Sequence, residues 1–264
     1  MKQNNFSPSV LWAMVFLVSG FGFMAQADTT LEFSSDEGSR HIYLTPRGVR
    51  MDISGKDGKP GSIIFDSDKN QYMVLAHEDK EYVVMTEKDI QAIGQMREQM
   101  MQKLEAQLAQ MPPAQREQMR QMMIQRMGGG MGGEDADKPV IRYVDSGRKE
   151  QVMGHHCAIY ELRMNQRHEG EVCLAPIDEL GIAPEDYASF ARMMDLMHKI
   201  VKAAGVSSDG MMAGMPKNMA PVRYESNGTE VTLKAIHTKS LDPALFAPPA
   251  GYQRHSLDIQ KLPR

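Results

Sequence analysis

Methionine residues gather in two glycine-containing segments of this chain, and their thioether sulfurs are soft ligands that suit Cu(I). The segment 117–133 reads EQMRQMMIQRMGGGMGG, and the segment 206–220 reads VSSDGMMAGMPKNMA. Helix packing explains a methionine in a loop less well than one in a helix. The sequence therefore offers a candidate set of Cu(I) ligands in the second segment: Met211, Met212, Met215 and Met219.

Other methionines recur at steps of three and four residues, together with leucine and phenylalanine. Such steps place side chains on one helix face, with Cβ atoms roughly 5–6 Å apart. Methionine packs flexibly and also suits adaptable partner surfaces, so core packing, a partner surface and a Cu(I) site all stay open. The residues predicted for a hydrophobic or partner surface are Met96, Met100, Leu104, Leu108, Met119, Met122, Met123, Phe190, Met193 and Met197.

The chain has two cysteines, Cys157 and Cys173, and they flank a stretch that reads as two strands around a polar turn. Cysteines on neighbouring strands can reach disulfide distance, so we predict a disulfide bond between them. A metal site or reactive thiol pair is the alternative, because His155, His156 and His168 lie close by in the sequence. The paired spacing of structural zinc sites and the CxxC spacing of redox enzymes are both missing.

No other motif in the sequence predicts catalysis or a cofactor. Residues 66–77 begin like a calcium loop, but Gln71 stands where glycine is needed and His77 where a bidentate glutamate is needed. GxSxG and Walker motifs do not occur, and no GxGxxG element follows a predicted strand. The formal net charge of −4 also argues against a nucleic-acid partner, which requires a basic face. We therefore expect no enzyme activity, no cofactor and no nucleic-acid partner.

The first 27 residues are typical of a cleaved signal peptide. Lys2 supplies the positive charge, an apolar run covers 10–24, and Ala25 and Ala27 are small residues of the type that signal peptidase reads. The alternative, an uncleaved anchor helix, needs roughly 20 apolar residues, which is more than this run supplies. We therefore expect cleavage after Ala27, a periplasmic location, and no membrane-spanning segment in the mature chain.

The remaining chain reads as a single domain, residues 28–257, followed by a loose tail, residues 258–264. Five β-rich runs separated by turn signals occur within residues 30–86. The period then changes to that of helices at 87–110 and 114–127, which together form a helical insertion over 87–127. Strands resume at 140–175, a third helix is predicted at 184–205, and two strands at 221–240 form a hairpin. Glycine- and methionine-rich loops are expected at 128–138 and 205–219.

This order contains no βαβ alternation, so it predicts an α+β fold. We expect a curved antiparallel β-sheet with about three amphipathic helices packed on one face.

Two stretches of the second half carry a recognisable motif. The first stretch combines an SG turn, a G-x-x-C-x-x-Y strand and a VCLA…ELG segment, carried here by Ser146, Gly147, Gly154, Cys157, Tyr160, 172–175, Leu180 and Gly181. The second is the ending D-x-x-x-F-x-x-P-x-G-Y, carried by Asp242, Phe246, Pro249, Gly251 and Tyr252. Both stretches resemble a family of secreted bacterial proteins, domain of unknown function 4412 (DUF4412). The resemblance implies an open, curved half-barrel like that of the outer-membrane lipoprotein carriers LolA and LolB, with helices in its concave face. His155 and His156 are not part of the family pattern.

Fold and composition together predict a non-catalytic periplasmic protein that binds a hydrophobic ligand, a lipid or lipoprotein, or an envelope protein. The first alternative is a methionine-rich protein that sequesters copper. The second alternative is a chaperone-like envelope-stress protein, because residues 111–123 look like segments of small periplasmic chaperones of the Spy/CpxP type.

Overall fold

A computed structural model gives the fold of most of the chain. It describes residues 27–36, 38–54, 58–112, 115–116, 141–164, 167–203, 215–226 and 228–256. Five predicted regions lie wholly or largely outside these ranges: the signal peptide, the helix 114–127, the loop 128–138, most of the loop 205–219 and the tail.

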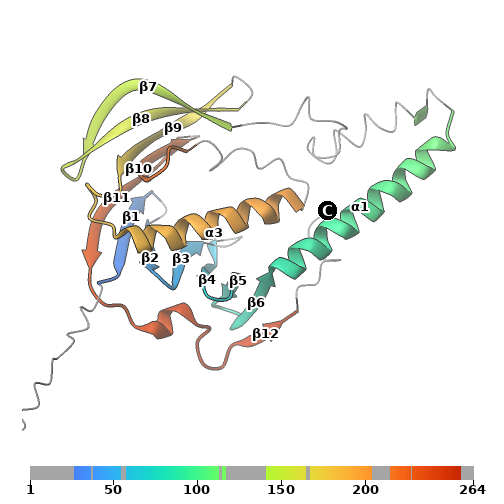
Figure 1. Ribbon diagram of the computed structural model, residues 1–264, viewed down its shortest axis with the longest axis horizontal. Coiled ribbons are helices and arrows are strands. Elements are labelled where there is room, and N and C mark those ends of the chain that lie inside the picture. The colour runs from blue at the N-terminus through green and yellow to red at the C-terminus, as the bar shows by residue number, and fades with distance from the viewer. Residues whose placement is uncertain are drawn as a thin grey trace, which may run out of the picture.

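The described strands form one twelve-stranded sheet that curves around a central helix (Figure 1). Their order across the sheet is β12-β6-β5-β4-β3-β2-β1-β11-β10-β9-β8-β7. The strands are β1 (Thr29–Ser35), β2 (Gly38–Thr45), β3 (Gly48–Ser54), β4 (Pro60–Asp66), β5 (Gln71–Ala76), β6 (Glu81–Thr86), β7 (Ile141–Val152), β8 (His155–Met164), β9 (Arg167–Pro176), β10 (Met219–Ser226), β11 (Thr229–Thr238) and β12 (Gln253–His255). All neighbours pair antiparallel except β12, which runs parallel to β6.

The five β-rich runs predicted within residues 30–86 are confirmed as β2 to β6. A further strand, β1, which no prediction included, lies at the centre between β2 and β11. In the second half, β7 is one long strand, interrupted by an irregularity between Asp145 and Lys149. Gly147 lies there with a φ of +69°, a conformation that glycine adopts readily, so the strand turns locally without ending.

Two α-helices occur in the described ranges, α1 (Glu87–Ala109) and α3 (Pro184–Ala203), so the expectation of about three helices on one face is not met there. α1 begins at a capping box, in which the Thr86 hydroxyl accepts from the Asp89 N–H and the Asp89 carboxylate accepts from the Thr86 N–H. α1 contacts β6 and α3 and then extends away from the sheet (Figure 1). Neither helix is long and apolar enough to cross a membrane.

α3 lies across the sheet and supplies the centre of the main hydrophobic core (Figure 1). Met193 and Leu196 of α3 pack there with Leu31 and Phe33 of β1 and with Leu44 of β2. These side chains are less than a tenth exposed. The central strands and α3 therefore stabilise each other by burying apolar surface.

The C-terminal segment covers the other face of the sheet. A short 3-10 helix, η2 (Pro243–Phe246), leads to β12, and Gln253 donates its backbone N–H to the Lys80 carbonyl at 2.8 Å. Phe246 and Tyr252, two residues of the family-like ending, pack against a cluster formed by Ile64, Met73 and Leu75. The ending thus holds β4 and β5 from outside.

Candidate ligand-binding groove

α3 has one face that packs on the sheet and another that lines a groove. Asp186, Ser189 and Met193 are completely buried on the first of these faces, and Leu196 is nearly so. The Ser189 hydroxyl donates to the Pro46 carbonyl at 2.7 Å, which ties the helix to the turn between β2 and β3. Met193 therefore belongs to the core, and its prediction as part of a hydrophobic or partner surface is wrong.

The second face of α3 lines a groove of about 630 Å³. The opposite wall is the segment 215–218 that leads into β10. Small side chains on the helix, Ala188 and Ala191, leave room between these walls. The lining residues are Ile177, Pro184, Tyr187, Ala188, Phe190, Ala191, Met194, Asp195, His198, Met215, Pro216, Lys217 and Asn218.

Two aromatic side chains separate this groove from the core. The ring centroids of Tyr187 and Phe190 lie 6.1 Å apart, with the rings tilted by 37°. Beneath them is a hollow of about 30 Å³, lined by Leu31, Phe33, Ile42, Leu44, Ile182, Tyr187, Phe190, Ala220 and Pro221. Every side chain of this lining is apolar or aromatic, so the hollow offers almost nothing to a water molecule. Apolar surface thus continues from the groove inward past the two rings.

The polar residues Asp195, Lys217 and Asn218 at the rim of the groove are exposed, whereas Tyr187 lies at its floor. The Tyr187 hydroxyl donates to the Met219 carbonyl at 2.8 Å, and burial raises the pKa of this phenol, so it stays neutral. Asp195 pairs with Lys199 at 3.0 Å, one helical turn further along α3. Lys217 is exposed on the opposite wall. The arrangement can hold an apolar chain inside while a polar end remains in water.

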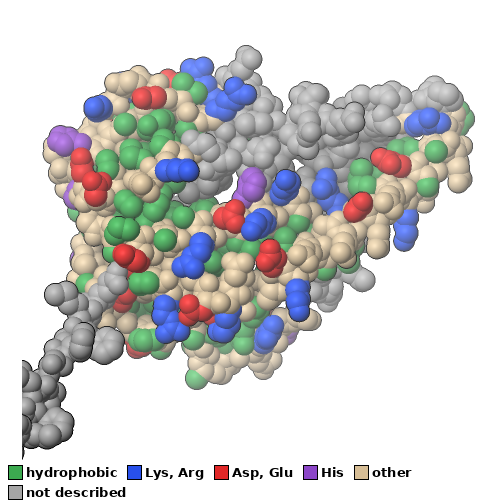
Figure 2. All heavy atoms as spheres, viewed as in Figure 1, with side chains coloured by type: hydrophobic (Ala, Val, Ile, Leu, Met, Phe, Trp, Pro, Cys, Tyr) green, Lys and Arg blue, Asp and Glu red, His purple; other side chains and the backbone are tan. Residues whose placement is uncertain are grey.

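The predicted hydrophobic or partner surface is divided between the two helices. Phe190 lines the groove, and Met197 packs against the core. On α1, Met96 and Met100 are 42% and 50% exposed. Figure 2 shows hydrophobic side chains exposed between charged ones along α1. Leu104 is half-buried. Leu108 is buried, so its prediction as part of this surface is wrong, like that of Met193. Met119, Met122 and Met123 lie outside the described residues.

Half of the candidate Cu(I) ligands can be placed. Met215 and Met219 are half-buried and pack against the cluster of Leu162, Val172 and Leu174. Met211 and Met212 lie outside the ranges that the structure describes, so copper binding by this set stays a prediction.

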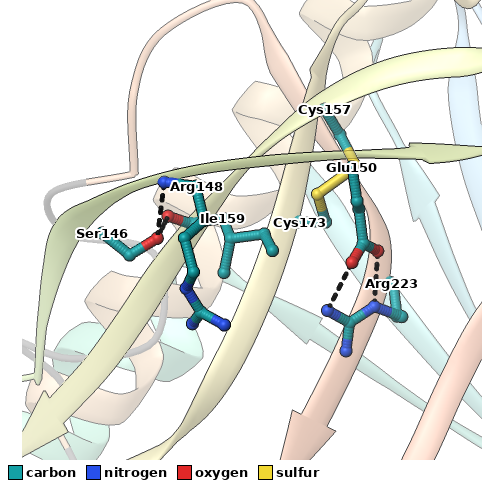
Figure 3. The surroundings of a disulfide bond; sticks show 7 residues. All are labelled: Ser146, Arg148, Glu150, Cys157, Ile159, Cys173 and Arg223. Atoms are coloured by element: carbon teal, nitrogen blue, oxygen red, sulfur yellow. Dashed lines mark hydrogen bonds and ion pairs between the residues drawn. A yellow bond between two sulfur atoms is a disulfide. The ribbon is translucent and has the colours of Figure 1, made fainter.

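The predicted disulfide between Cys157 and Cys173 is confirmed (Figure 3). It joins β8 to β9, with the two Cα atoms 5.4 Å apart, and both side chains are buried in the core that contains α3. A carboxylate oxygen of Glu150 lies within 4.8 Å of both sulfurs, but the Glu150 carboxylate accepts from Arg223 at 2.6 and 2.9 Å. Within the described ranges no histidine joins this group. The pair therefore serves as a covalent crosslink.

A serine–histidine contact that the sequence did not reveal lies on the other face of the sheet. Ser62 Oγ is 2.8 Å from His77 Nε2, and His77 Nδ1 is 2.9 Å from the Tyr252 hydroxyl. A nucleophile needs access to substrate, but Ser62 is completely buried and also contacts Asp52 and Arg50 at 2.9 Å. This network therefore fastens the C-terminal ending to β4 and β5, and only the fold brings its members together.

Comparison with known proteins gives a family and distant structural neighbours. No match was found among curated proteins. A chain in the complex structure of Pseudomonas aeruginosa MucA/MucB aligns with a TM-score of 0.30 and 10% identity, over 84% of this chain and 56% of that one. A crystal structure of MucB aligns with a TM-score of 0.29 and 10% identity, over 87% and 59%. The chain thus spans less than two thirds of these neighbours, and scores this low establish no shared function.

The family assignment rests on a match in sequence. The family model described as domain of unknown function (DUF4412) matches residues 85–252, which include α1, the disulfide, α3 and the family-like ending. The chain therefore belongs to the DUF4412 family.

Proposed function

We propose that this protein is a non-catalytic binding protein whose α3 groove takes the hydrocarbon chain of a lipid or of an acylated partner. The observation that carries the proposal is the apolar groove of about 630 Å³ with Tyr187 and Phe190 at its floor. Its volume falls in the range of roughly 300–1,000 Å³ that is typical of small-ligand sites. An apolar lining with a few polar groups at the rim is also typical of such sites.

The rim favours an amphiphile with an anionic end. Lys217 is exposed beside Pro216 and Asn218, where its ammonium group can approach a carboxylate or phosphate without leaving water. The chain itself would be held by apolar contacts with Phe190 and Met194, because methionine and aromatic side chains adapt to an alkyl chain.

We also propose that the chain is exported to the periplasm and that its leader is removed after Ala27. The buried disulfide supports export, because disulfides of this kind persist in oxidising compartments.

Binding of palmitate to the purified protein, measured by displacement of a fluorescent fatty-acid probe, tests the groove. In Ala191→Trp, the indole fills the space between α3 and residues 215–218, so we expect at least a tenfold weaker affinity, about 1.4 kcal/mol or more. The matched control is Ala106→Trp, the same change at an exposed position of α1, which should bind as the parent does. Palmitate affinity that is unchanged in Ala191→Trp, or absent in the parent, would contradict the proposal.

A second candidate function, binding of a protein partner through α1, is favoured by the exposure of Met96 and Met100. Large apolar side chains in water are typical of partner surfaces when they adjoin on one helix face. The test is suppression of aggregation of an unfolded client protein. The double change Met96→Lys and Met100→Lys should abolish it, while Ala191→Trp should leave it intact.

A further inference from the structure

Asp186, in the first turn of α3, has a buried carboxylate with one unsatisfied oxygen. Its side chain is completely buried, and its Oδ2 accepts a hydrogen bond from the Thr29 hydroxyl at 3.0 Å. For Oδ1, the described part of the chain supplies no hydrogen-bond partner. A buried carboxylate without full pairing is strongly unfavourable, so this position calls for a cation.

The charges around Asp186 make its ionised form still less favourable. Burial raises the pKa of Asp186 most, and the neighbouring Asp28 and Glu185 carboxylates raise it further. The hydroxyl and the backbone N–H of Thr29 lower it, but they do not offset burial, and the pKa is raised to about 6. The surroundings therefore favour either a proton on Asp186 or a positive group beside it.

The residue before Thr29 is held firmly next to this carboxylate. The Asp28 carbonyl accepts from the Lys239 N–H at 3.0 Å, and its side-chain Oδ2 accepts from the Leu241 N–H at 2.8 Å. Along an extended strand each residue advances about 3.3 Å, so the nitrogen of Asp28 lies about that far from the nitrogen of Thr29. The Thr29 N–H and hydroxyl both bond to the Asp186 carboxylate, so the Asp28 nitrogen is one residue away from atoms that contact this carboxylate.

We propose that removal of the leader creates the missing partner, the α-ammonium group of Asp28, which pairs with Asp186 and fastens α3 to β1. This inference rests on the proposed export and cleavage. Hydrolysis of the bond between Ala27 and Asp28 places the hydroxyl of a water molecule on the Ala27 carbonyl carbon and a hydrogen on the Asp28 nitrogen. The new amine takes up a further proton at neutral pH, because a free α-amino group has a pKa of roughly 7.7–8.0.

Through this pairing, removal of the leader would stabilise the part of α3 that lines the groove. Before cleavage the Asp28 nitrogen is a neutral amide, and the first turn of α3 is held against an uncompensated carboxylate. After cleavage the same turn, which carries Pro184 and Tyr187 of the groove lining, gains an ion pair. A leader-bearing chain would therefore have a looser groove than the mature one.

The test uses the full chain, exported by its own leader and purified from the periplasm, with its intact mass identifying the first residue. The α-amine is then converted to a neutral amide with acetic anhydride near pH 6.5, where lysine amines stay protonated and the Thr29 N–H is not consumed. The Tm of this singly acetylated protein is compared with that of the unmodified protein at pH 7.5. We expect a fall of about 4–8 °C, from a loss of roughly two kcal/mol in a domain of this size. The same fall is expected in Glu185→Gln, which removes a neighbouring exposed carboxylate, whereas Asp186→Asn should show a fall of less than about 1 °C.

The outcomes separate the two proposals. A first residue other than Asp28 overturns the cleavage proposal and this inference together. A mature chain that begins at Asp28 but shows no fall in Tm, or shows the same fall in Asp186→Asn, overturns this inference alone. If Asp186→Asn does not fold, the rate of amine modification against pH in the parent decides: an α-amine pKa above the ordinary range supports the ion pair, and an ordinary pKa overturns it.

Discussion

The two described helices have similar methionine-containing stripes, but the fold uses them differently. α3 has Met193 completely buried against the sheet, whereas α1 has Met96 and Met100 about half exposed. α3 lies across β2 and β3, while α1 contacts the body of the molecule through α3 and β6 (Figure 1). Spacing thus indicates which residues share a helix face, but what covers that face depends on the path of the chain.

The two helices differ in burial because they are attached to the rest of the molecule differently. α3 is fixed by polar groups along the face that meets the sheet: Asp186 binds Thr29, Ser189 binds Pro46, and the Tyr72 hydroxyl donates to the Met193 carbonyl. On α1, Ile90 and Ile93 are buried near its start, and Gly94 lies beside Ala203 at the end of α3. The remaining turns of α1 extend beyond the sheet, so Met96 and Met100 are not covered by it and stay exposed.

The largest expected effect is the loss of packing in α3. Met193→Ala removes a fully buried side chain from the main core, so the free energy of unfolding should fall by about 2–5 kcal/mol. Denaturation by urea measures it. A loss below about 0.5 kcal/mol, as at an ordinary surface position, would show that α3 is not part of the core.

The next largest effect is a dependence of folding stability on pH, which comes from Asp186 of α3. In a chain that keeps a neutral group on the Asp28 nitrogen, the pKa of Asp186 is about 6, against 3.8 ordinarily. The folded state then binds the proton more tightly than the unfolded state does. This group therefore contributes stability below pH 4 that is lost as the pH rises through 6, on the order of 3 kcal/mol at 1.36 kcal/mol per pKa unit.

Urea denaturation of the amine-blocked protein between pH 4 and 7 checks this prediction. Asp186→Asn should remove this part of the dependence, and a parent with a free α-amine should show less of it. The idea fails if the blocked protein and Asp186→Asn have the same profile.

Two substitutions, one for each helix, each remove a single hydrogen bond of similar strength. Ser189→Ala removes the bond from α3 to Pro46, and Thr86→Ala removes the N-cap of α1, each at about 1 kcal/mol. We expect Ser189→Ala to weaken palmitate binding and Thr86→Ala to leave it unchanged. Fluorescent-probe displacement and urea denaturation of both variants give the comparison. Equal losses of affinity would mean that α1 supports the groove.

The smallest effect is expected on the exposed stripe of α1. Met96→Ala and Met100→Ala should each change the free energy of unfolding by less than about 0.5 kcal/mol, because both side chains already contact water. The same urea measurement applies. A loss comparable to that of Met193→Ala would indicate that this stripe is covered in solution.

Local patterns predicted much of the sheet. Alternation and turn residues located β2 to β6 and the β10–β11 hairpin, and strand spacing predicted the bond between Cys157 and Cys173. β1 was missed, although Leu31 and Phe33 alternate in it. Its pairing with β11 joins residues about 200 positions apart, which no local pattern reports.

The groove was only partly predictable. Phe190 and Met215 were singled out for their type, but Ala188 and Ala191 make the space by being small, which hydrophobic periodicity does not register. Asp186 was not singled out, because its contact with Thr29 spans 157 positions. Long-range contacts of this kind are set by the whole fold and not by the neighbouring sequence.

Hydrogen–deuterium exchange with and without palmitate tests the central claim most directly, because it reads α3 and α1 in the same experiment. The account predicts that palmitate slows exchange in residues 184–198 and 215–219 and leaves residues 94–109 of α1 unchanged. Slower exchange in α1, with none in α3, would contradict it and assign ligand binding to the exposed methionine stripe.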